Sequence, residues 1–197
     1  MRGERRLSGL QFYKRKRSIH LGVLREIMLW VLTTAIAVFL AGVLVYFFGF
    51  RISLLGQSME PRLAAGQEVL VDRLVYRVRG IRRGEVIAFY SGGNVEAHPY
   101  IKRVVTLPGE TIELRDGRIY INGESEPEAE NYDKIEYAGM LEKPMTLAED
   151  EFFVLGDNRN NSEDSRSSGI GTVSSSMVIG RVWYKLPGDG MMMGTVR

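Results

Sequence analysis

Residues 111–121 read TIELRDGRIYI, and the fold class follows from this stretch. Apolar and polar side chains alternate on both sides of Asp116 and Gly117, which is the pattern of two half-buried β-strands. An Asp-Gly pair between alternating runs is the strongest short-range signal for a β-hairpin. We therefore predict two antiparallel strands that flank this pair, and a second turn at residues 122–123.

Short β-like runs separated by turn residues continue on both sides of the hairpin. They lie at residues 67–72, 84–90, 100–105, 152–155 and 178–186. Helical periodicity is almost absent between them, so we predict a mainly β fold: an antiparallel, partly closed β-barrel or sandwich. Residues 124–150 are acidic and poorly patterned, and we interpret them as a solvated excursion from the sheet.

The N-terminal part has a different composition. Residues 1–26 hold eight Lys or Arg against two Glu, and residues 27–50 contain no charged residue. As a helix, this apolar segment would be about 36 Å long, which is enough to cross a hydrocarbon core of about 30 Å. A buried helix of a soluble protein and a cleavable signal peptide are the alternatives, and the length of the segment disfavours the second.

The charge asymmetry orients this predicted span. Basic residues gather on the cytoplasmic side of membrane helices, and here they precede the span while only Arg51 directly follows it. We therefore expect residues 1–26 to be a basic cytoplasmic tail, residues 27–50 a transmembrane helix, and residues 51–197 an extracytoplasmic β-rich domain. Nucleic acid is then not an expected partner.

The composition also limits the chemistry. The 197 residues include no cysteine, which excludes a disulfide framework and a thiol nucleophile. His20 and His98 are the two histidines, so a multi-histidine metal site is excluded. The polar loop at residues 156–166 fails the calcium-loop template, because Arg159 occupies a ligand position. We expect no metal and no cofactor.

A candidate nucleophile lies just after the apolar segment. Residues 56–63 read GQSMEPRL, and Gly56 and Pro61 delimit a tight turn around Ser58. A lone serine is weak evidence, because most serines are surface or turn residues. A nucleophilic role requires a base elsewhere in the chain.

Lys102 is the candidate base, because it lies inside the apolar run at residues 100–105. If its face of the strand is the inner one, desolvation lowers its pKa, and a fall of roughly 2.5 to 3 units would leave it half neutral near pH 7 to 8. A neutral lysine beside Ser58 could take the hydroxyl proton. A solvent-facing lysine is the alternative reading, and His98 is a rival base that Pro99 disfavours as part of the same strand.

The loop at residues 156–166 reads GDNRNNSEDSR and is the other concentrated polar segment. Ser162 could orient the lysine nitrogen, and an Asp164 to Arg166 pair could fix the loop. A solvated turn is the alternative.

Four blocks of this sequence resemble the conserved boxes of bacterial type I signal peptidases, in the same order behind an N-terminal span. They are residues 56–63, 84–89, 100–109 and 156–166. The resemblance implies a membrane-anchored serine endopeptidase that removes signal peptides from exported proteins with a Ser/Lys dyad. Ser58 would be the nucleophile and Lys102 the general base, with Ser162 hydrogen-bonded to the lysine and with Asp164 and Arg166 as supports.

The resemblance also implies the substrate and how it binds. Exported preproteins with small residues at the first and third positions before the cut would add as a strand to the sheet edge. The residues that would line or adjoin the shallow pockets for these small side chains are Ile52, Leu55, Met59, Leu63, Tyr100 and Ile101. Membrane lipid is the other expected partner, and the oligomeric state is left open.

Two positions depart from the family pattern. Gly56 stands where some members have a serine that helps to bind the oxyanion, as in similar enzymes from Gram-positive bacteria, and Arg62 replaces a common threonine. The oxyanion hole would then rest on backbone N–H groups near Ser58. Two further hypotheses remain at this point: a self-cleaving Ser/Lys protease of the repressor type, and a non-catalytic anchored β domain.

Overall fold

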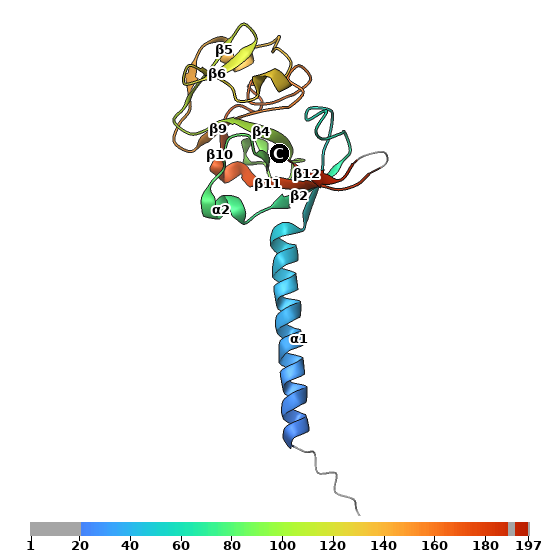
Figure 1. Cartoon of the computed structure of the whole chain (residues 1–197). Helices are drawn as coiled ribbons and strands as arrows, with labels where there is room; N and C mark the ends of the chain where they lie inside the picture. The colour runs from blue at the N-terminus through green and yellow to red at the C-terminus, as the bar shows by residue number, and fades with distance from the viewer. Residues whose placement is uncertain (1–20, 189–191, 197) are drawn as a thin grey trace, which may run out of the picture. The chain divides into compact units, whose positions relative to one another are not determined.

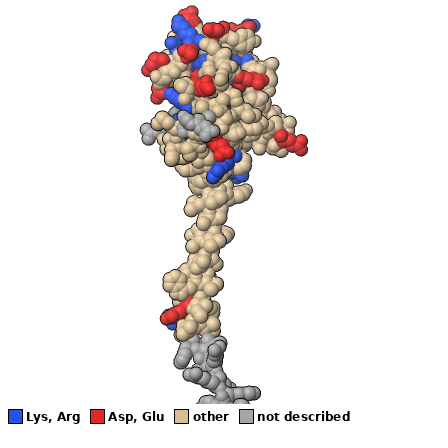
Figure 2. Space-filling view, turned by 90° about the vertical axis from the view of Figure 1, so that its right-hand side faces the viewer, with Lys and Arg blue, Asp and Glu red and all other residues tan. Residues whose placement is uncertain are grey.

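The computed structural model describes residues 21–188 and 192–196, so most of the predicted basic tail lies outside the described residues. The chain divides into two compact units, residues 1–42 and residues 43–197. Helix α1, Leu21–Phe48, is long and apolar enough to cross a membrane, by length and composition. Figure 2 shows almost all of it free of charged side chains. Helix α1 begins six residues before the predicted span at residues 27–50, and it ends two residues before the end of that span.

The second unit is built around an eight-stranded antiparallel sheet (Figure 1). Its strands follow the order β1-β2-β11-β3-β4-β9-β10, with β12 paired to β11. Their bounds are β1 Phe50–Ser53, β2 Glu68–Asp72, β3 Val86–Phe89, β4 Tyr100–Thr106, β9 Glu151–Leu155, β10 Val173–Ser174, β11 Val178–Lys185 and β12 Gly194–Thr195. The predicted mainly β, antiparallel, partly closed fold is confirmed.

A smaller antiparallel sheet has the order β7-β6-β5-β8. Its strands are β5 Thr111–Arg115, β6 Arg118–Ile121, β7 Glu124–Ser125 and β8 Met145–Thr146. The predicted hairpin joins β5 to β6, and its two turn residues have positive φ, 50° at Asp116 and 78° at Gly117. Figure 2 shows charged side chains gathered over this end of the unit.

Short helices complete the unit, and the sequence patterns did not predict them. Helix α2 spans Val75–Arg79. Four 3₁₀ turns span Ser91–Gly93, Ala129–Asn131, Gly139–Glu142 and Ser175–Met177. The Asp72 carboxylate accepts the backbone N–H groups of Leu74 and Val75 at 2.8 and 3.0 Å, which fixes the start of α2.

The interpretation of residues 124–150 as a solvated excursion from the sheet is wrong in part, because most of their side chains are exposed but the segment is not outside the sheets. The segment supplies β7 and β8 to the smaller sheet. It also buries Tyr132, Ile135, Leu141 and Leu147, and the last three pack in one apolar cluster with side chains of β5, β6 and β9. These apolar residues are spaced irregularly in loops, so no period of two or 3.6 marks them as buried.

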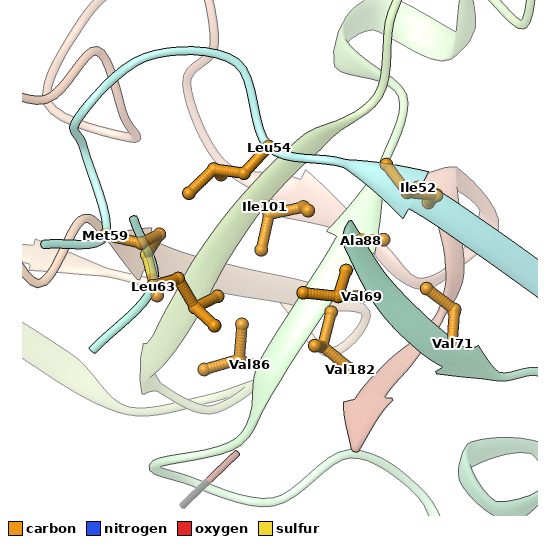
Figure 3. Packing of buried hydrophobic residues seen from close by; sticks show 10 residues of the cluster. All are labelled: Ile52, Leu54, Met59, Leu63, Val69, Val71, Val86, Ala88, Ile101 and Val182. Atoms are coloured by element: carbon orange, nitrogen blue, oxygen red, sulfur yellow. The ribbon is translucent and has the colours of Figure 1, made fainter. Parts of the chain in front are cut away.

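Strand β4 lies in the middle of the larger sheet and is covered on both faces. One face adjoins the cluster drawn in Figure 3, whose buried residues are Ile52, Leu54, Met59, Leu63, Val69, Val71, Val86, Ala88, Ile101 and Val182. The other face packs Val104 with Ile87, Phe89 and Val154. This strand therefore has no solvent-facing side, and both Lys102 and Arg103 are buried. The alternative of a solvent-facing lysine is wrong.

Candidate active site

Ser58 lies in the turn that follows β1, and the core fixes this turn. The fully buried side chains of Met59 and Leu63 anchor it in the cluster of Figure 3, and the N–H of Leu63 donates to the carbonyl of Met59 at 2.9 Å. Gly56 has φ of +77°, a conformation that a side chain at this position would strain. The predicted tight turn is therefore present.

Strand β4 brings Lys102 to this turn. Its Nζ donates a 2.6 Å hydrogen bond to Ser58 Oγ, across 44 positions of sequence. Both side chains are buried, because Lys102 is 3% exposed and Ser58 is 7% exposed. The contact is within the distance that direct proton transfer requires.

Burial lowers the pKa of Lys102 from 10.5 to about 8. Desolvation is the largest cause, and the carboxylates of Asp164 and Glu163 oppose it. The predicted direction is confirmed: an ammonium removed from water loses hydration, so its neutral form becomes more favourable. About half of Lys102 is then neutral at pH 8, and about a tenth at pH 7.

The rival base His98 lies outside this contact. It is exposed, Pro99 separates it from the start of β4 at Tyr100, and its Nδ1 lies 3.1 Å from the carbonyl oxygen of Pro99. The prediction that Pro99 excludes His98 from the strand is confirmed.

The loop at residues 156–166 is held by the predicted pair. Arg166 donates from Nε to Asp164 Oδ1 at 2.8 Å and from Nη2 to Asp164 Oδ2 at 2.9 Å, and both side chains are buried. Asp164 Oδ2 also accepts the N–H of Gly156 at 3.1 Å. The alternative of a solvated turn is therefore wrong for this part of the loop.

Ser162 does not make the predicted hydrogen bond to Lys102. Its buried Oγ has no hydrogen-bond partner within the described part of the chain. Instead it packs against Gly156, where an added Cβ would lie 2.2 Å from Ser162 Oγ and 2.4 Å from the carbonyl oxygen of Ser58. The serine is thus near the candidate nucleophile, but its hydroxyl is not bonded to the lysine.

A pocket of about 310 Å³ opens beside Ser58 and Lys102. Of the residues predicted to line or adjoin pockets, Leu55, Tyr100 and Ile101 line this one. The other three predicted residues, Ile52, Met59 and Leu63, lie in the buried core of Figure 3 and do not line it. The rival base His98 also lines the pocket. So do Leu54, Ala97 and Pro99, which no pattern in the sequence singled out as pocket residues.

The site contains two further buried ion pairs that the sequence patterns did not predict. Arg103 makes two hydrogen bonds to the Asp157 carboxylate, at 2.6 and 2.7 Å. Arg159 does the same with Glu126, at 2.7 and 2.6 Å, and its guanidinium lies 3.9 Å from the centre of the Tyr132 ring. The sequence did offer a signal for the first pair, because Arg103 is a charged residue inside the apolar run at residues 100–105. Within residues 21–188 and 192–196, no group of three or more His, Cys, Asp or Glu could hold a metal ion.

Comparison with known proteins places this geometry in a family. The family model described as "Signal peptidase, peptidase S26" matches residues 27–186. Signal peptidase IB of Staphylococcus aureus (strain COL) is 27% identical over 176 residues, which cover 82% of this chain and 90% of that protein. Signal peptidase I of Bacillus amyloliquefaciens is 34% identical over 158 residues, which cover 77% of this chain and 83% of that protein.

A solved structure of a signal peptidase I from Enterococcus faecalis V583 is 35% identical, with a TM-score of 0.40, and the match covers 52% of this chain and 96% of that one. The family match over most of the described chain leaves no support for a repressor-type protease or a non-catalytic domain. The chain belongs to the signal peptidase family, peptidase S26, and is a serine endopeptidase.

Proposed function

We propose that this chain is a membrane-anchored signal peptidase in which Ser58 is the nucleophile and neutral Lys102 is the general base. The observation that carries the proposal is the 2.6 Å contact between Lys102 Nζ and Ser58 Oγ in a buried site. The lowered pKa of Lys102 supports it, because only the unprotonated amine can accept a proton.

The reaction proceeds in two steps. Ser58 Oγ attacks the scissile carbonyl while its proton moves to Lys102, which then protonates the leaving amine as the peptide bond breaks and an ester to Ser58 remains. Water attacks this ester, Lys102 accepts a proton from the water, and that proton returns to Ser58 Oγ as the acid leaves. One base therefore serves both steps.

The backbone N–H of Ser58 is the proposed oxyanion donor. Among the described residues this N–H donates to no acceptor, so it is available to a developing negative charge. Gly56 carries no hydroxyl that could add a second donor. Preorganised backbone donors stabilise tetrahedral intermediates because they need no reorganisation during the reaction.

The substrate is proposed to bind as an added strand. Pairing between β4 and β9 begins at Arg103, so residues 100–102 pair only with β3. Strand β1 ends the sheet order and pairs only with β2. Both free edges adjoin the pocket, which Leu55 and Tyr100 line. A small apolar pocket favours small side chains at the first and third positions before the cut, as in exported preproteins.

Membrane anchoring and orientation complete the proposal. Residues 1–26 form the cytoplasmic tail, residues 27–50 span the membrane, and residues 51–197 lie outside the cytoplasm as the peptidase domain. The length of α1 supports the span, and the eight basic residues before it support the orientation.

Cleavage of a preprotein with alanine at the first and third positions before the cut tests the dyad. With full-length protein in detergent, we expect Ser58→Ala and Lys102→Ala to abolish cleavage, because each removes one partner of the proton transfer. Ser125→Ala, at an exposed position of β7, is the matched control and should cleave at the wild-type rate. Equal cleavage by Ser58→Ala and wild-type protein would refute the mechanism.

A further inference from the structure

A second pocket of the unit formed by residues 43–197 has no part in the proposed catalysis. Its volume is about 270 Å³. Aromatic rings, two arginines and aliphatic side chains line it, among them Tyr46, Phe47, Arg73, Arg77, Tyr90 and Val95. No Asp or Glu occurs among the described residues that line it. The pocket therefore carries a net positive charge.

This pocket begins where the apolar helix ends. Tyr46 and Phe47 belong to the last turn of α1, and the N–H of Arg73 donates to the carbonyl of Phe47 at 3.1 Å. The Arg73 guanidinium also lies 3.5 Å from the centre of the Phe50 ring. Tyrosine at the end of a membrane span is typical of the level of the lipid headgroups. If α1 spans the membrane, Arg73 and Arg77 therefore face that level.

The two arginines have their charge available for a ligand. Within the described parts of the chain, neither Arg73 nor Arg77 forms an ion pair, whereas the neighbouring Arg79 pairs with Glu85. The nearest acid in sequence, Asp72, is 2% exposed, and its carboxylate accepts the backbone N–H groups of Leu74 and Val75 at the start of α2. Guanidinium groups match the geometry of phosphate oxygens, and they form bidentate hydrogen bonds with them.

The surface next to the arginines is apolar. Val95, which lines the pocket, is 70% exposed, and Val78, which directly follows Arg77 in α2, is 79% exposed. A phosphate ligand alone would leave these side chains in water. A lipid supplies both a phosphate for the arginines and an apolar region for the valines.

We propose that this pocket binds the phosphate of an anionic phospholipid from the membrane that α1 spans. Arg73 and Arg77 hold the phosphate, and Val78 and Val95 contact the interfacial part of the bilayer. The inference rests on the proposed membrane anchoring. Its consequence is that anionic lipid keeps residues 43–197 against the membrane surface.

Because the chain contains no cysteine, Val95→Cys gives a single site for an environment-sensitive fluorophore at the rim of the pocket. The labelled full-length protein in non-ionic detergent is titrated with dihexanoyl phosphatidylglycerol, dihexanoyl phosphatidylcholine and inorganic phosphate at constant ionic strength. We expect a saturable change with phosphatidylglycerol only. The same label at Ser125→Cys, on exposed β7, is the control position and should not respond.

Substitution of the arginine tests the contact itself. In the labelled protein, Arg77→Gln should weaken phosphatidylglycerol binding about fivefold, which is the equivalent of about 1 kcal/mol per basic residue near an anionic surface. Arg77→Lys should recover much of that loss. Arg115→Gln, at an exposed position of β5, is the matched control and should bind as wild type.

Several outcomes would overturn the proposal without touching the catalytic mechanism. Equal responses to inorganic phosphate would show a general anion site, and no response to any ligand would show no site. The KM of Arg77→Gln for the preprotein, measured in detergent without anionic lipid, gives a further test. A KM above the wild-type value would show that the pocket binds an acidic segment of the substrate. The proposal expects Arg77→Gln to cleave at the wild-type rate under that condition.

Discussion

At the scale of single residues, Lys102 links catalysis to the stability of the fold. Its pKa is about 8 in the folded chain and 10.5 as the ordinary value. Because the folded pKa is the lower one, the unfolded state binds more protons between these values, and stability rises with pH across that window. Below pH 8, burial of the charged lysine lowers the free energy of unfolding by its full amount, about 3 kcal/mol. This cost decreases as the pH rises towards 10.5.

The rate of cleavage should follow the neutral form of Lys102. We expect the rate to rise with pH, with a midpoint of about 8, and to reach a plateau above it. Lys102→Met should be inactive at every pH and more stable at pH 7 by on the order of 2 to 3 kcal/mol, because the buried charge is gone. A pH-rate profile and thermal unfolding measure both. A pH-independent rate, or a Lys102→Met variant less stable than wild type, would contradict the buried-base assignment.

Gly156 is the second residue whose role the packing defines. An alanine there would place its Cβ 2.2 Å from Ser162 Oγ and 2.4 Å from the carbonyl oxygen of Ser58. We expect Gly156→Ala to displace the nucleophile and to lower kcat on the order of 100-fold, as displacements of about 1 Å do. Steady-state cleavage of a preprotein measures the loss.

Gly169→Ala is the matched control for this substitution. Its added Cβ would have its nearest contact at 3.4 Å, with Glu163 Oε1 at the end of a flexible side chain, so its kcat should equal that of wild type. A fully active Gly156→Ala protein would show that the close contact with Ser58 has no catalytic importance.

At the scale of elements, three arginine and carboxylate pairs fasten the loop at residues 156–166. They are Arg103 with Asp157, Arg159 with Glu126, and Arg166 with Asp164, and all six side chains are buried. The first pair joins the loop to β4 next to Lys102, and the second joins it to the chain after β7. The loop that adjoins Ser58 is therefore attached to both sheets.

The pair between Arg159 and Glu126 should behave as a buried ion pair. Glu126→Leu leaves the guanidinium without its carboxylate, and we expect it to lower the free energy of unfolding by about 3 to 5 kcal/mol. Glu126→Leu combined with Arg159→Leu should recover most of this loss, because no unpaired charge remains. Chemical denaturation of the four proteins of this double-mutant cycle gives the coupling free energy.

Glu124→Leu is the control for the loss of one carboxylate two positions away. This side chain is exposed in β7, so we expect a change within about 0.5 kcal/mol. Equal effects of Glu124→Leu and Glu126→Leu would show that the buried pair contributes nothing beyond surface charge.

At the scale of the whole molecule, the proposed topology has residues 1–26 and residues 51–197 on opposite sides of a membrane. Because the chain is free of cysteine, single cysteines report each side. In intact cells, a membrane-impermeant maleimide should label Ser125→Cys, and it should label Ser8→Cys only after permeabilisation. Labelling of Ser8→Cys in intact cells would reverse the proposed orientation.

Much of the fold was predictable because its signals are local. Alternation around Asp116 and Gly117 marked the hairpin, and the uncharged run at residues 27–50 marked α1. Each of these signals depends on neighbours a few positions apart, through turn geometry or side-chain period. Residues 124–150 carry no such period, and the burial of Tyr132, Ile135, Leu141 and Leu147 went unpredicted for that reason.

The sequence alone thus determined the fold class, the apolar helix, and Ser58 and Lys102 as the candidate pair. Only the tertiary structure decided that the two side chains meet at 2.6 Å, that Lys102 is buried in a strand covered on both faces, and that Ser162 makes no bond to it. The turn around Ser58 was visible from Gly56 and Pro61, but its distance from β4 was not. Contacts of this kind form when a sheet closes over positions far apart in the chain, and no local pattern of residues encodes that closure.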